Sequence, residues 1–292
     1  MDRRGGPLKN RPRPPHRPVP RTAPSPAPPR SSHRRADAPP HTVFPLSFSS
    51  RVPLNFLAHA LPLLDPGDPL AAARVVGANV PDLLSVADRR VRLRSRHLDA
   101  ADAAGTLDSD PGLAAFAAGV RRHLRDDGWF HATRAFAEVT SSLGVALREA
   151  FGPGDGFRCG FLGHIGTEML LDDVLAARLP GVLGRYYDTL DRADAAEVQG
   201  LVNSLHPVGT GRLVKVIDGF RASRFLEDYA TPAGVLYRMN QVCKRVGLVP
   251  LPAEATGVLA DARGMVDDRR SDLLPPARYA WPPAADPPGE SP

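Results

Sequence analysis

The chain has 292 residues, 37 of them basic and 32 acidic, which is enough for one large domain or two modest ones. The charge is uneven: residues 1–53 hold eleven Lys or Arg and two acids, a net of +9, so residues 54–292 sum to 26 − 30 = −4. This mildly acidic part lacks the clustered positive charge that a nucleic-acid backbone requires, so we do not expect it to bind nucleic acid.

The cysteines and the hydrophobic pattern indicate the cellular compartment in which the protein resides. Cys159 and Cys243 are too few for a disulfide framework and do not have paired metal-ligand spacing. No run of 18 apolar residues predicts a membrane span, and residues 1–50 lack the apolar core of a secretory signal. We therefore expect a cytoplasmic protein without a membrane-spanning segment.

The N-terminal 53 residues form the first predicted element. Residues 1–50 contain thirteen prolines, and such a segment buries too little apolar surface to offset the entropy of ordering. The composition predicts a disordered basic tail. A transit peptide or a nucleic-acid-binding arm is the alternative, although prolines oppose the amphipathic helix of a transit peptide. The Pro-rich stretch 275–292 predicts a second disordered tail.

Between the tails the apolar residues recur three and four apart, as in amphipathic helices. Asp68-Pro69 and Asp110-Pro111 are helix-start signals. Further helices are predicted at 132–151, 157–179, 194–205, 212–225, 232–246 and 253–274. No stretch alternates long enough to predict a sheet. The pattern therefore predicts an all-α protein with a single helical-bundle domain at residues 54–274.

Two predicted helices carry candidate metal ligands four residues apart. One has His123, Asp127 and His131, and the other has His164, Glu168 and Asp172. Side chains at this spacing stay on one helix face. Imidazole and carboxylate ligands together suit Mn²⁺, Fe²⁺ or Zn²⁺, and two facing helices build such sites in bundles.

The alternative to a metal site is a solvated helix face, which is the usual explanation for one isolated pair. The second stripe lies in an apolar, glycine-rich run, residues 159–172, where unpaired polar groups are costly. The glycines predict close approach of another helix or a ligand. A second glycine-rich segment, residues 152–156, lacks the Gly-Lys-Ser/Thr ending of a phosphate-binding loop and is interpreted as an interhelical loop.

The segment Asn55-Phe56-Leu57-Ala58-His59 resembles the opening of acyl-carrier-protein phosphodiesterases. Three more motifs follow in that family's order, at Gly77 through Asp82, at Gly119-x-x-x-His123-x-x-x-Asp127, and at His164. The resemblance covers about residues 54–180 and implies a helical, Mn²⁺-dependent phosphodiesterase distantly related to HD-type phosphohydrolases. Those enzymes remove 4′-phosphopantetheine from holo acyl carrier protein.

The resemblance implies a metal site built from five residues, His59, Asp82, His123, Asp127 and His164. We expect His131 or Glu168 to act as catalytic general base. Arg121 and Arg125 are predicted to bind substrate phosphate, and Arg122 lies off the ligand face. Two family residues are replaced here, a His by Arg121 and an Asp by Gly163. The natural substrate can therefore be another phosphate ester.

Two alternatives to the phosphodiesterase remain open. A non-catalytic helical interaction protein would use the same stripes as buried hydrogen-bond networks. A zinc enzyme like α-helical phospholipase C also uses scattered His and Asp ligands, but it usually has more histidines and an export signal. Because relatives begin at the Asn55 motif, translation from Val52 or Leu54 is a further hypothesis, which the intact mass of the native protein tests.

Overall fold

The computed structural model describes residues 55–152 and 158–279. The predicted N-terminal tail, the alternative start at Val52 or Leu54, most of the glycine-rich loop 152–156, and residues 280–292 lie outside this part of the chain.

The described residues form helices and contain no strand, which confirms the predicted all-α class. In chain order the elements are α1 (Phe56–Ala60), η1 (Leu61–Leu63), α2 (Ala71–Ala87), α3 (Ser95–Ala103), α4 (Pro111–Phe130), α5 (Arg134–Phe151), α6 (Cys159–Arg178), α7 (Val182–Asp191), α8 (Ala195–Leu205), α9 (Leu213–Ser223), η2 (Phe225–Ala230), α10 (Pro232–Val246), α11 (Ala255–Asp268) and α12 (Arg270–Leu273).

Helix starts follow local capping chemistry. The Asp110 carboxylate accepts hydrogen bonds from the backbone N–H groups of Gly112 and Leu113, and Pro111 occupies the first position of α4. Asp194 caps α8 in the same way. Pro81 lies inside α2, so Asp82 lies within a continuous helix and does not cap a new one. The helices α3 and α7 were not predicted from the pattern.

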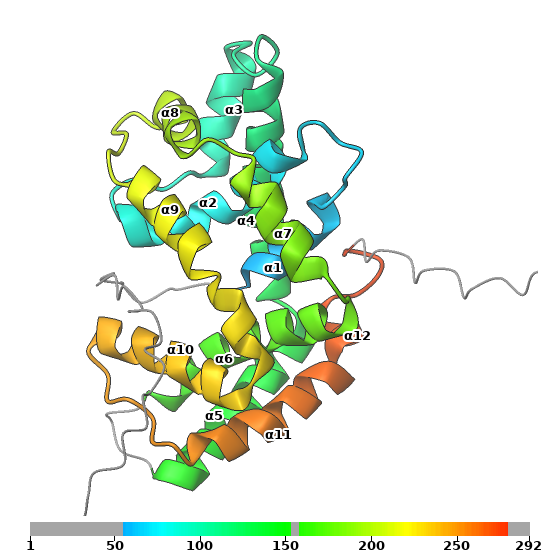
Figure 1. Cartoon of the computed structure of the whole chain (residues 1–292), viewed down its shortest axis with the longest axis vertical. Coiled ribbons are helices and arrows are strands. Elements are labelled where there is room, and N and C mark those ends of the chain that lie inside the picture. The colour runs from blue at the N-terminus through cyan, green and yellow to red at the C-terminus, as the bar shows by residue number, and fades with distance from the viewer. Residues whose placement is uncertain (1–54, 153–157, 280–292) are drawn as a thin grey trace, which may run out of the picture. The chain divides into compact units, whose positions relative to one another are not determined.

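Figure 1 shows α5, α6, α10 and α11 gathered on one side of α1, with α2, α4, α7 and α9 on the other. The short helix α1 contacts α2, α4, α6 and α7, and all five of its residues are buried. Because α1 is too short to be stable by itself, these neighbours must hold it in place.

Two glycines allow α2 and α4 to pack with their backbones in contact. A Cβ added at Gly119 would lie 2.1 Å from the carbonyl oxygen of Arg74, and one at Gly77 would lie 2.2 Å from that of Phe116. Gly163 has the same function between α6 and α5, since its Cβ would lie 2.4 Å from the Thr140 oxygen. The predicted close approach of a helix at the glycine-rich run is thus confirmed.

The packed fold continues past the predicted boundary at Leu274. Tyr279 is buried, and its hydroxyl donates a hydrogen bond of 2.6 Å to the carbonyl oxygen of Ala58 in α1. The prediction that disorder begins at residue 275 is therefore wrong for residues 275–279. Among the described helices, none combines the length and the apolar character needed to cross a bilayer.

Candidate metal centre

The Asp172 carboxylate of α6 fixes the helix that carries His59. Its two oxygens accept hydrogen bonds of 2.9 Å from the backbone N–H groups of Leu57 and Ala58. These N–H groups belong to the first turn of α1 and have no partner within the helix. Asp172 therefore caps α1 from a different element, while Tyr279 holds the Ala58 carbonyl.

Three potential metal ligands from three helices meet in the interior. His59 of α1, Asp82 of α2 and His123 of α4 each offer one ligand atom, and these atoms lie within 4.8 Å of one another. The His59 and His123 rings are 4.1 Å apart between centroids, and His123 Nε2 lies 3.5 Å from Asp82 Oδ1. All three residues are at most 3% exposed. We call this set the buried group.

Three atoms of the buried group have no hydrogen-bond partner among the described residues, namely His59 Nε2, Asp82 Oδ2 and His123 Nδ1. Leaving such atoms unpaired in the interior typically costs about 1–3 kcal/mol each. Burial lowers the pKa of both His59 and His123, which keeps the imidazoles neutral, the form that binds metal. A cation at this position would satisfy His59 Nε2 and Asp82 Oδ2 together.

The Asp82 carboxyl is destabilised as an anion in the absence of a cation. Burial raises its pKa well above the usual value, and the negative charges of Asp127, Glu168 and Asp172 raise it further. A divalent ion beside Asp82 would reverse this effect, because the nearest charge would then be positive. The donor set of two neutral imidazoles and one carboxylate therefore fits a metal ion.

A second set of three ligands lies toward the surface and is called the outer group. Its members are His131, the residue that ends α4, and His164 and Glu168 of α6, whose ligand atoms also lie within 4.8 Å of one another. His131 Nε2 and His164 Nε2 lie 2.9 and 3.1 Å from the same atom, Glu168 Oε1. The two imidazole rings stack at 4.8 Å.

Asp127 lies between the two groups. It follows His123 by one helical turn, and its Oδ1 lies 3.0 Å from His131 Nδ1. Burial by itself lowers the pKa of His131, but the hydrogen bonds to Asp127 and Glu168 and their charges outweigh it and raise the pKa to about 9. The same pairing outweighs burial at Asp127 and lowers its pKa to about 2. At neutral pH, with no metal bound, His131 therefore carries a proton on both ring nitrogens, and its role as general base stays a prediction.

The structure divides the predicted five-residue metal site. His59, Asp82 and His123 come together, whereas His164 lies with His131 and Glu168. Asp127 reaches His131 and also influences the charge state of His59 and His123. The two predicted stripes on α4 and α6 meet at the contact between His131 and Glu168.

Of the arginines near the site, Arg121 turns toward α3 and pairs with Asp99 and Asp102. Arg125 is mostly exposed and pairs with Asp126. Arg122 has the least exposed side chain of the three, pairs with Asp126, and acts electrostatically on His59. The substrate-binding roles of Arg121 and Arg125 stay predictions. Arg122 is the arginine of the three whose positive charge lowers the pKa of His59 in the buried group.

The packing at Gly163 leaves no room for a side chain. Any side chain there, where the resemblance led us to expect an Asp, would clash with the Thr140 carbonyl of α5. Sequence reasoning did not find the capping role of Asp172, although the residue's position in an apolar run marked it as unusual. The Asn79 side chain, which lies within the Gly77–Asp82 motif, donates a hydrogen bond of 2.7 Å to the Tyr186 hydroxyl, a partner that the sequence does not identify.

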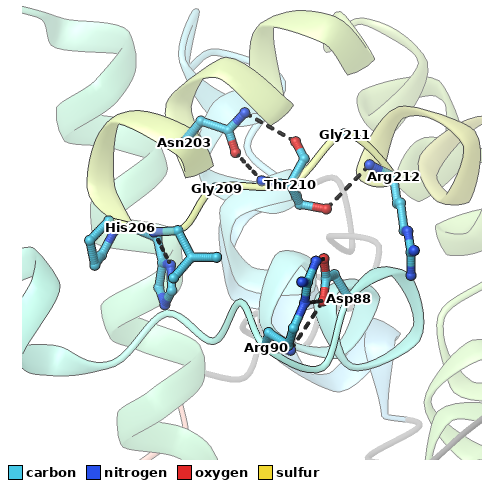
Figure 2. Close-up of a pocket in the computed structure, with 10 residues that line it drawn as sticks. Asp88, Arg90, Asn203, His206, Gly209, Thr210, Gly211 and Arg212 are labelled. Atoms are coloured by element: carbon cyan, nitrogen blue, oxygen red, sulfur yellow. Dashed lines mark hydrogen bonds and ion pairs between the residues drawn. The ribbon is translucent and has the colours of Figure 1, made fainter.

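A polar hollow of about 580 Å³ lies away from the metal ligands, at the loop before α9. Figure 2 shows that its polar groups largely satisfy one another: Asn203 makes two hydrogen bonds with Thr210, and Arg90 pairs with Asp88. No set of three potential metal ligands in the described residues includes any of its lining residues. We therefore place the chemistry at the two histidine groups despite the size of this hollow.

No protein-family model, curated protein or solved structure matches this chain. Its function must therefore be argued from the geometry of the two groups.

Proposed function

We propose that this chain is a metal-dependent phosphoric ester hydrolase whose buried group binds a divalent cation. The observation that carries the proposal is the convergence of His59, Asp82 and His123 from three helices, with His59 Nε2 and Asp82 Oδ2 buried and unpaired. A fold retains such a costly arrangement when it serves a purpose, and cation binding is the purpose that these atoms suit.

The ligand chemistry favours a transition-metal ion over Mg²⁺ or Ca²⁺, which prefer oxygen ligands. Two imidazoles and one carboxylate suit Mn²⁺, Fe²⁺ and Zn²⁺. Manganese is our first choice, because the motifs that supply these ligands resemble those of the Mn²⁺-dependent acyl-carrier-protein phosphodiesterases.

A bound divalent ion supplies polarisation of a phosphoryl oxygen and a lowered pKa for a bound water. The residues of this chain then divide the remaining work. The buried group holds the ion, and Asp127 fixes the orientation of the His131 ring through Nδ1. His131 is arranged to donate a proton to the leaving oxygen of an ester. Glu168 is the neighbouring group with lone pairs that can accept one.

The proposed substrate is a phosphodiester, and holo acyl carrier protein is the first one to test. This choice rests on the order of the four motifs between Asn55 and His164. The losses at Arg121 and Gly163 leave room for a different phosphodiester or a phosphomonoester. Arg122 is the guanidinium placed best to contribute positive charge beside the buried group.

The test is hydrolysis by the full chain supplied with Mn²⁺, using holo acyl carrier protein and bis(p-nitrophenyl) phosphate as separate substrates. We expect release of 4′-phosphopantetheine or p-nitrophenol that requires Mn²⁺ and is lost in His123→Ala. The matched control is His97→Ala, a histidine of α3 outside both groups. Equal hydrolysis by wild type and His123→Ala would overturn the proposal.

The rival function is a non-catalytic helical interaction protein. The outer group supports it, because His131, His164, Glu168 and Asp127 contact one another without any ion. The buried group does not, because three of its atoms lack partners. The rival predicts that the chain binds no metal and hydrolyses neither substrate.

A further inference from the structure

We infer that the outer group is a second divalent-cation site, so that the chain holds two ions, one buried and one facing solvent. The inference rests on the proposed function and deepens it. With a second ion bound, His131 and Glu168 hold that ion instead of transferring a proton. The ligands are His131 Nε2, His164 Nε2 and Glu168 Oε1.

The distances within the outer group fit a metal. Both imidazole nitrogens lie near one carboxylate oxygen, at 2.9 and 3.1 Å. Metal–ligand bonds of about 2.1 Å at right angles place neighbouring ligand atoms about 3.0 Å apart. Each imidazole nitrogen is therefore already spaced from Glu168 Oε1 like a neighbouring ligand of one ion, and the two nitrogens lie within 4.8 Å of each other.

The surroundings of His131 also match those of a metal ligand. A metal-binding histidine almost always donates its other ring N–H to a carboxylate or carbonyl, which fixes the tautomer and turns the free nitrogen toward the metal. Here Asp127 Oδ1 lies 3.0 Å from His131 Nδ1, so Nε2 is the nitrogen left to bind a cation. Asp127 would thus position a ligand of the outer ion while lying one turn from His123 of the buried group.

The two sites differ in access to solvent. The side chains of His131 and His164 are 26% and 38% exposed, whereas Glu168 is fully buried. Every member of the buried group is at most 3% exposed. Three protein ligands at a partly open position leave room for water or substrate, as in catalytic metal sites. A substrate phosphate would therefore meet the outer ion first.

Metal stoichiometry tests the inference with the metal alone as the probe. The full chain, stripped of metal, is dialysed against Mn²⁺ and, separately, Zn²⁺, and bound metal per chain is counted. We expect about two ions in wild type and in the control His97→Ala, and about one in His164→Ala. His164→Gln, which can keep a hydrogen bond to Glu168, should also bind one, with circular dichroism confirming that each variant is folded.

Wild-type binding of a single ion, or the same count in wild type and both His164 variants, would overturn the second site. The metal count and the hydrolysis assay together show whether the second site, the proposed function or both are wrong. One ion per chain together with Mn²⁺-dependent hydrolysis removes only the second site. If the chain binds two ions but hydrolyses no phosphate ester, the proposed function is wrong and the second site is confirmed.

Discussion

The contact between α2 and α4 offers a direct test of how packing places the buried group. In Gly119→Ala the new Cβ would lie 2.1 Å from the Arg74 carbonyl oxygen, where ordinary contact begins at 3.4 Å. The helices must therefore separate by about 3.4 − 2.1 = 1.3 Å at this point. Asp82 and His123 lie on these two helices, and a working site tolerates displacements of only about 0.5 Å.

We expect two effects from this substitution. Overpacking typically costs about 1–3 kcal/mol, and each kcal/mol lowers Tm by about 2–4 °C in a domain of this size. The displaced ligands should weaken Mn²⁺ binding at least about tenfold. Thermal denaturation of the metal-free protein and calorimetric titration with Mn²⁺ measure the two effects separately.

Gly128→Ala is the matched control, because it makes the same change on the same helix where nothing lies within 4 Å of the new Cβ. It should leave Mn²⁺ affinity unchanged and stabilise the protein by up to about 1 kcal/mol through helix propensity. The reasoning is refuted if Gly119→Ala matches Gly128→Ala in both Tm and Mn²⁺ affinity.

Three further predictions concern the supports of the site. The folded pKa of His131, about 9, exceeds its unfolded value, so the contribution of His131 to the stability of the metal-free protein should be complete below pH 6.5 and fall by up to about 3 kcal/mol as the pH rises through 9. Urea denaturation across this range checks it, and an equal loss in His131→Gln would contradict it. Asp172→Ala removes two hydrogen bonds to the backbone of α1 and should cost about 2–4 kcal/mol in urea denaturation, whereas a cost below 1 kcal/mol would mean that α1 is held by other contacts. Tyr279→Phe should cost about 1 kcal/mol through loss of the bond to Ala58; unchanged stability would show that this hydroxyl does not anchor α1.

Much of the fold could be predicted because its signals are local. The Asp110-Pro111 pair specifies a helix start through the cap and the proline ring, and both act within one turn. The four-residue spacing of His123, Asp127 and His131 places them on one face, whatever that face contacts. The predicted bounds of α10, Pro232–Val246, match the observed ones. This helix begins after the N-cap Thr231 and ends at the C-cap Gly247, which are also local signals.

The grouping of ligands could not be predicted, because it depends on contacts between residues far apart in the chain. Periodicity shows which face of α6 carries His164, but not that His164 meets His131 while His59 meets His123. The position of His59 depends on Asp172, 114 residues away from Ala58 along the chain. The glycines of the run 159–172 indicated close approach, although only the packed helices reveal that Gly163 contacts α5 and not a ligand.

The measurement that tests the central claim most directly is the metal content of the full chain, purified without chelator or affinity nickel, beside the variant Asp82→Asn. Asp82 belongs to the buried group alone, so its loss isolates that site. Our account predicts at least one equivalent of Mn, Fe or Zn in wild type and about one equivalent less in Asp82→Asn. Absence of metal from wild type, even after incubation with Mn²⁺, would contradict it.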